Sequence, residues 1–108
     1  MHEFWNPENL PAKTLAPGIT AKIASRGKLM LSLVTLEPNA AVPTHSHPHE
    51  QMGLLVSGTM ELTIAGETRV VTGNGMYLVP GGVPHSAKGG PDGALALDAF
   101  SPPREEYR

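Results

Sequence analysis

The residues best suited to chemistry are the alternating histidines His45, His47 and His49, which Gln51 follows. In an extended chain, side chains two positions apart point to the same side, so His45, His47 and Gln51 share a face. Pro48 restricts the backbone, so this alternation of faces is not a reliable guide to where His49 points. We interpret His49 as a residue that supports a ligand from behind or as a packing residue. Imidazole groups bind divalent ions well, so the segment predicts a metal site.

A fourth histidine, His85, lies far along the chain, directly after the Pro/Gly-rich segment 80–84. Such a loop would place His85 at the start of a strand that faces the first group. We therefore expect His45, His47, Gln51 and His85 to hold one divalent ion per chain, either Ni, Zn, Mn or Fe. The alternative is a chance cluster on a surface loop that binds a metal only weakly.

The composition excludes several classes of protein. A chain of 108 residues suits one domain, and 40% hydrophobic with 17% charged residues is ordinary for a globular protein. A net charge of -2 argues against nucleic-acid binding, and no apolar run is long enough to cross a membrane. The chain has no cysteine, no serine-nucleophile motif and no signal-peptide pattern at its N-terminus, so we expect a cytoplasmic protein.

The elements that must position these residues are short strands separated by turns. The 12 glycines and 11 prolines punctuate runs with β-type alternation, and no helical pattern is convincing. This indicates an all-β, single-domain fold, either a small β-barrel or a jelly roll. We expect an irregular N-terminal arm over 1–16, a barrel over 17–100 and a tail over 101–108. The expected strands are 19–24, 28–36, 50–56, 59–64, 68–72, 76–79, 85–88 and 94–100, with a loop at 38–43 and turns at Gly58 and 89–93.

Alternation also assigns faces to the predicted strands. In 94–100, Ala94, Ala96, Asp98 and Phe100 share one face, which would suit a barrel interior with room for a ligand. Asp98 is then either a buried carboxylate with a partner or function, or a residue in water at the sheet edge. The run 28–36 is apolar at most positions, as expected of a strand covered on both faces.

The two histidine motifs resemble those of the cupins. The first cupin motif is matched by His45-x-His47-x3-Gln51-x6-Gly58, and the second by Pro80-x-Gly82-x2-His85. The resemblance implies a cupin-type jelly-roll β-barrel, also called a double-stranded β-helix, with the metal inside its mouth. The chain departs from the motifs in four places, with Gln51 for Glu, Asn39 and Asn74 for Gly, and Gly89 for Asn. Three neutral imidazoles and a neutral amide leave the charge of the ion uncompensated, which favours an anionic substrate and non-redox chemistry.

The end of the chain, 98–107, is similar to that of the small pectin-degradation cupins, which open 4,5-unsaturated uronates to linear keto sugars. The resemblance implies that Asp98 and Arg104 are catalytic and that Phe100 and Arg104 bind the substrate. Arg104 can bind the uronate carboxylate through two hydrogen bonds, and Asp98 is a candidate general acid/base if burial raises its pKa. The residue pattern alone favours the alternative that Arg104 is a solvated tail residue.

The resemblance leaves other functions open. The chain could be a metal-dependent dioxygenase, a cyclase or isomerase of another small substrate, or a sugar-binding cupin without activity. The expected partners are a small anionic sugar and, by the resemblance, a second copy of the chain in a homodimer.

Overall fold

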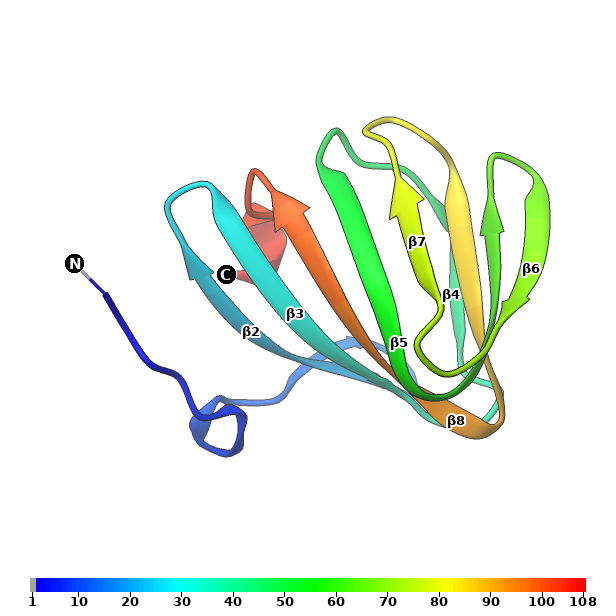
Figure 1. The fold of residues 1–108 in the computed structure, drawn as a ribbon, viewed down its shortest axis with the longest axis horizontal. Coiled ribbons are helices and arrows are strands. Elements are labelled where there is room, and N and C mark those ends of the chain that lie inside the picture. Colours follow the sequence, from blue (N-terminus) through cyan, green and yellow to red (C-terminus); the bar gives the residue numbers. More distant parts are fainter. Residues whose placement is uncertain (1) are drawn as a thin grey trace.

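The computed structural model describes residues 2–108 and contains eight strands and two short 3-10 helices (Figure 1). The elements are η1 (Pro7–Asn9), β1 (Lys13–Ala16), β2 (Ile19–Arg26), β3 (Leu29–Leu36), β4 (Ala41–His45), β5 (Glu50–Ile64), β6 (Glu67–Val71), β7 (Met76–Val79), β8 (His85–Ser101) and η2 (Glu105–Tyr107). The predicted all-β fold is confirmed. Within residues 2–108, no helix is long and apolar enough to cross a membrane.

The strands form two layers that share β5 and β8. The first layer joins β1, β2 and β3 to the second half of β8, the first half of β5 and β7. The second layer joins β4 to the first half of β8, the second half of β5 and β6. The layers converge at the lower end of the view and spread apart at the upper end (Figure 1). All pairs are antiparallel, as in a jelly roll.

The long strands β5 and β8 correct two predicted turns. We expected Gly58 and segment 89–93 to end strands, but both strands continue through these positions. The register between β5 and β8 shifts on either side of Gly58, which has φ +79°, and Gly93 has φ +78°. Such bulges bend a strand without ending its pairing, so one strand can serve both layers.

Two further segments differ from the expectation. Lys13–Ala16, predicted as part of an irregular arm, forms β1, and its backbone pairs with the edge of β2. Ala41–His45, which begins in the predicted loop, forms β4 along the edge of β8. Neither segment alternates clearly in sequence, and β4 includes Pro43, which an edge strand tolerates at an irregular position. Backbone pairing rather than apolar patterning therefore defines both strands.

The core lies between the layers and follows the predicted alternation. Met60 and Leu62 point inward from β5 and are buried, and Ala94, Ala96, Asp98 and Phe100 form the inward face of β8. Asn39 and Asn74, which stand where the cupin motifs have Gly, have φ +62° and +67°, a left-handed conformation that Asn adopts more readily than most residues. The hydrophobic core between the layers consists of one cluster of buried residues, namely Ile19, Ala21, Val34, Leu36, Leu55, Met60, Leu62, Ala94 and Ala96.

The face of the first layer that points away from the core is apolar and only partly covered in the single chain, where Trp5, Pro7 and Leu10 lie beside Leu31, Leu33 and Leu97. On β3 the even positions are buried, but Leu31 is 48% exposed, so within this chain the strand is not covered on both faces as predicted. The register aligns Leu31 with Ala99, Met52 and Leu78 across four strands. A parallel row comprises Leu33, Leu97, Leu54 and Met76. We call these two rows the outer face.

Candidate active site

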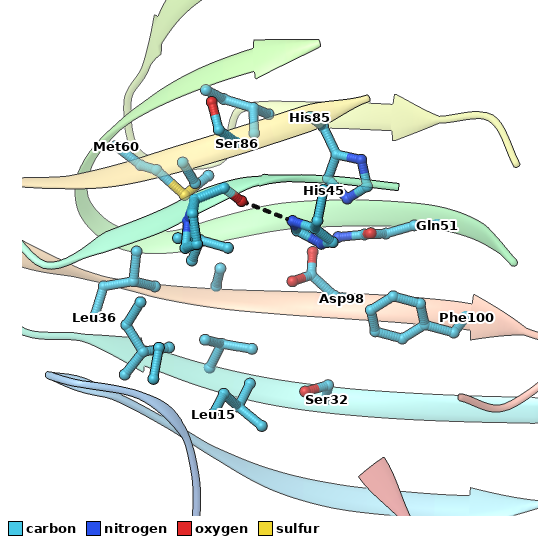
Figure 2. A pocket seen from close by; sticks show the side chains of 18 of the residues that line it. Leu15, Ser32, Leu36, His45, Gln51, Met60, His85, Ser86, Asp98 and Phe100 are labelled. Atoms are coloured by element: carbon cyan, nitrogen blue, oxygen red, sulfur yellow. Dashed lines mark hydrogen bonds between the residues drawn. The ribbon is translucent and has the colours of Figure 1, made fainter. Parts of the chain in front are cut away.

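The open end of the barrel gathers the four predicted metal ligands. β4 ends at His45, β8 begins at His85, and the two residues are direct cross-strand partners. Gln51 lies near the start of β5, opposite Phe100 of β8. Figure 2 shows His45, His85 and Gln51 turned toward one another, with Asp98 beside them. Residues far apart in sequence therefore meet because β4, β5 and β8 are neighbours.

The three imidazoles are close enough to share one ion. One nitrogen atom from each of His45, His47 and His85 lies within 4.8 Å of the others. The ring centroids of His45 and His85 are 4.3 Å apart, and those of His47 and His85 are 4.9 Å apart. His49 is not part of this group, although its backbone carbonyl contacts His47.

Each imidazole is oriented by a backbone carbonyl two residues away. The Nδ1 atoms of His45, His47 and His85 lie 2.9, 3.1 and 2.9 Å from the carbonyl oxygens of Pro43, His49 and Val83. A carbonyl only accepts, so Nδ1 donates in each case and the neutral ring keeps its lone pair on Nε2. This is the way in which outer-shell carbonyls commonly orient metal-binding histidines.

The donor atoms fit a divalent cation. The Nε2 atom of His85 is buried and has no hydrogen-bond partner among residues 2–108. The Nε2 of His47 and the Oε1 of Gln51 are 3.0 Å apart, and with Nδ1 protonated both atoms present lone pairs. Burial lowers the pKa of His47 to about 4 and lowers that of His85, so both rings are neutral at physiological pH. Neutral imidazoles are the form that binds metal.

Asp98 is a buried carboxylate next to the proposed ligands. It is 8% exposed, which excludes the alternative that it lies in water at the sheet edge. Tyr77 donates a 2.7 Å hydrogen bond to its Oδ1, and the Gln51 side chain also hydrogen-bonds it. Burial raises the pKa of Asp98 to about 6, although both hydrogen bonds oppose the shift. A carboxyl group with this pKa can both donate and accept a proton near neutrality.

Arg104 is held at the cavity by the tail of the chain. Its guanidinium lies over the Tyr107 ring, with Cζ 4.2 Å from the centroid, and 5.6 Å from the centroid of Phe100. Nη1 donates to the Tyr107 hydroxyl at 2.9 Å. Nε donates to Glu106 Oε1 at 2.8 Å, and Nη2 lies 2.7 Å from the same oxygen in an ion pair. The alternative of a solvated tail residue is wrong, since the side chain is only 11% exposed. The remaining Nη protons are available to an anion.

Most of these residues, though not His47 or Glu106, line one cavity of about 390 Å³. Its polar part includes His45, Gln51, His85, Asp98 and Arg104, and its inner part is apolar. Figure 2 shows Leu15, Leu36 and Met60 lining the cavity away from Asp98 and Phe100. Tyr77, Glu106 and Tyr107 contact Asp98 or Arg104 but were not predicted as site residues. The residues 105–107 lie in the tail that matched the pectin-degradation cupins, whereas no sequence signal marks Tyr77.

Comparison with known proteins settles the family. A cupin domain model matches residues 32–97. The chain belongs to the cupin family. It is 27% identical over 109 residues to "Pectin degradation protein KdgF" of Dickeya dadantii (strain 3937), covering 99% of each protein. The structure of KdgF from Halomonas sp. is 27% identical, covers 100% of both chains and has a TM-score of 0.93. The resemblance stated from the motifs is therefore confirmed.

A second curated relative is an isomerase. The chain is 33% identical over 83 residues to H2HPP isomerase of Bacillus subtilis. The match covers 75% of this chain but 35% of that protein, so this cupin spans about a third of the length of that relative.

Proposed function

We propose that this cupin is a metal-dependent enzyme that opens the ring of 4,5-unsaturated uronates from pectin or alginate breakdown and yields linear keto sugars. The observation that carries the proposal is the buried carboxylate of Asp98 beside three converging imidazoles, in a cavity that also holds Arg104. The similarity to the KdgF proteins along the whole chain supports an enzyme of pectin degradation.

The proposed metal ligands are His45, His47, Gln51 and His85, which would hold one ion of Ni, Zn, Mn or Fe. A divalent ion bound there supplies Lewis-acid polarisation of a carboxylate or ring oxygen of the substrate. The neutral donor set leaves the positive charge free to attract an anionic sugar, which favours non-redox chemistry.

The other proposed binding residues orient the sugar. The free Nη protons of Arg104 bind the uronate carboxylate, and the stacking of the guanidinium on Tyr107 fixes its plane. Phe100, which is buried beside His47 with ring centroids 5.8 Å apart, packs against the sugar ring. The substrate is thereby held with its double bond near Asp98.

Ring opening requires a proton at C4 and an oxygen atom at C5 of the sugar. When C4 of the enol ether takes a proton, a water oxygen bonds to C5, and the bond between C5 and the ring oxygen then breaks to leave a C5 ketone. The ring oxygen leaves as a hydroxyl on C1, and this hydrate releases water as the aldehyde forms. Asp98 donates the proton to C4 and recovers one from the incoming water, which its pKa of about 6 permits.

The first test follows the loss of the C4–C5 double-bond absorbance of an unsaturated monouronate. The purified protein is compared as isolated, after chelation, and after addition of Ni, Zn, Mn or Fe. We expect loss above the spontaneous rate with metal, and a return to that rate after chelation. No acceleration with any metal would refute the proposed reaction.

Substitution of the carboxylate tests the role of Asp98. Asp98→Asn should reduce kcat by about 10²–10⁴-fold, because the general acid/base is removed. Metal content, measured by elemental analysis, should be unchanged, since Asp98 is not a proposed ligand. Asp92→Asn is the matched control, because Asp92 is an exposed residue of the same strand. Full activity of Asp98→Asn would reject this role.

The similarity to H2HPP isomerase supports a second candidate, an isomerase of a small keto acid. The same proton transfer by Asp98 would serve this reaction, with a keto acid in place of the sugar. Turnover of a keto acid without turnover of the uronate would favour it. Metal-dependent oxygen consumption with a substrate would instead indicate a dioxygenase, and tight sugar binding without turnover would indicate a binding protein.

We also propose a homodimer that acts in the cytoplasm. Each chain has a barrel over 17–100, a tail over 101–108 and an arm over 1–16, whose last part, Lys13–Ala16, pairs with the barrel as β1. The dimer is supported by the outer face, where Leu31, Met52, Met76 and Leu78 are 48%, 59%, 79% and 51% exposed. Contiguous apolar surface of this kind commonly marks a protein interface. The cytoplasmic location is supported by the absence of cysteine, and cell fractionation tests it.

A further inference from the structure

Tyr77 contacts the proposed catalytic carboxylate from a strand that is not next to it. Tyr77 lies on β7 and Asp98 on β8, and β5 runs between them. The register pairs Gly53 of β5 with Tyr77 on one side and with Asp98 on the other. The Tyr77 hydroxyl nevertheless reaches Asp98 Oδ1 at 2.7 Å. The hydrogen bond therefore passes over Gly53.

Gly53 makes this crossing possible because it has no side chain. A Cβ atom built at Gly53 would overlap both Asp98 Oδ1 and the Tyr77 ring. The backbone of Gly53 has no positive φ that would require glycine at this position. Close packing of Tyr77 and Asp98, rather than backbone conformation, therefore excludes larger residues here.

The hydrogen bond makes the two oxygens of Asp98 unequal. The Tyr77 hydroxyl has one proton, and burial raises its pKa, so it remains a donor at physiological pH. Because it donates to Oδ1, it fixes which oxygen of Asp98 faces Tyr77 and leaves Oδ2 without this hydrogen bond. Gln51, itself a proposed metal ligand, contacts the same carboxyl group, and its Oε1 lies 3.0 Å from Nε2 of His47.

We propose that Tyr77 is a positioning residue which, across Gly53, holds Asp98 so that Oδ2 exchanges a proton with the substrate. This inference rests on the proposed function, in which Asp98 is the general acid/base. Tyr77 itself does not transfer a proton to the sugar.

The decisive variant is Tyr77→Phe, which keeps the ring and removes the hydroxyl. We expect kcat to fall by about 10- to 100-fold, the usual effect of losing an outer-shell hydrogen bond. KM and bound metal should stay within about twofold of the wild-type values, because no proposed substrate or metal contact is lost. An unchanged kcat would overturn the inference. A lower kcat would also overturn it if the variant had lost its metal or no longer showed the thermal unfolding transition of a folded protein.

A second variant tests the crossing. Gly53→Ala should separate Tyr77 from Asp98 and lower kcat at least as much as Tyr77→Phe. Gly73→Ala is the matched control, because a Cβ at Gly73 has no atom within 4 Å and the residue lies outside the cavity. Full activity of Gly53→Ala in a folded protein would contradict the proposed geometry.

The Asp98→Asn variant separates the two proposals. If Asp98→Asn is inactive and Tyr77→Phe is fully active, the positioning role fails while the proposed function stands. If Asp98→Asn is fully active, the catalytic role of Asp98 fails, and the inference about Tyr77 fails with it.

Discussion

The local arrangement of the imidazoles shows how individual residues prepare the site. Each ring donates Nδ1–H to a carbonyl two residues away, so its orientation depends on its own loop or strand end. Val83 precedes Pro84 and supplies the carbonyl for His85, while Pro43 supplies the one for His45. The prolines stiffen the segments that carry these carbonyls. The orientation of the three proposed ligands is therefore already set in the folded chain, which would reduce the ordering required if an ion binds.

At the same scale, burial of Asp98 should make stability depend on pH in the metal-free protein. The pKa is about 6 in the folded chain against 3.8 in a model peptide, so the folded state binds the proton more tightly. The stabilising contribution of protonated Asp98 to the free energy of unfolding is therefore fully present below about pH 4. It is lost as the pH rises through 6 and the buried carboxyl group ionises.

Asp98→Asn should therefore stabilise the metal-free protein at pH 7, by about 2–3 kcal/mol, since the buried charge is removed. Chemical denaturation at pH 7 and at pH 4 checks this, and the gain should become small at pH 4. If Asp98→Asn were less stable than the wild type at pH 7, the expected increase in the free energy of unfolding would be contradicted.

At the scale of elements, the bends in β5 and β8 allow two strands to build both layers. Gly58 and Gly93 lie at the same bend, and a Cβ at Gly58 would overlap the carbonyl oxygen of Gly93. The first half of β5 carries Gln51, while its second half pairs with the His85 end of β8. The bend therefore determines how Gln51 and His85 meet.

Gly58→Ala should destabilise the fold by about 3–5 kcal/mol, because it adds a steric overlap to an unfavourable positive φ. Gly66→Ala is the matched control, since Gly66 has φ +82° but no atom within 4 Å of a built Cβ. The control should cost about 1–2 kcal/mol. Urea denaturation of both variants measures the difference, and equal losses would show that the overlap at Gly58 is relieved.

At the scale of the whole molecule, the outer face is an apolar surface that stays partly exposed in the single chain. Its rows cross β3, β8, β5 and β7, and the same strands present Asp98, Phe100 and Gln51 to the cavity on their other face. A second copy packed on the outer face would cover the apolar side of the layer that carries the proposed catalytic residues. Such burial would restrict the motion of these strands.

Leu31→Glu should convert the proposed homodimer into a monomer, because a charge would be buried at its interface. Analytical ultracentrifugation at several concentrations measures the mass of wild type and variant. Val70→Glu is the control, since Val70 is 67% exposed on β6, away from the outer face, and should leave the mass unchanged. A wild-type protein that is monomeric at micromolar concentration would reject the proposed dimer.

The sequence by itself determined the all-β class, the inward residues of β8 and the histidines that converge. These follow from local geometry, since alternation assigns faces within a strand and Pro/Gly segments mark where strands begin. Only the tertiary structure decided that Asp98 is buried against Tyr77, that β5 and β8 continue through their glycines, and that Arg104 stacks on Tyr107. These features depend on strand order and on contacts between distant segments. Local alternation holds no information about which strand lies beside which, so the crossing over Gly53 could not be predicted from it.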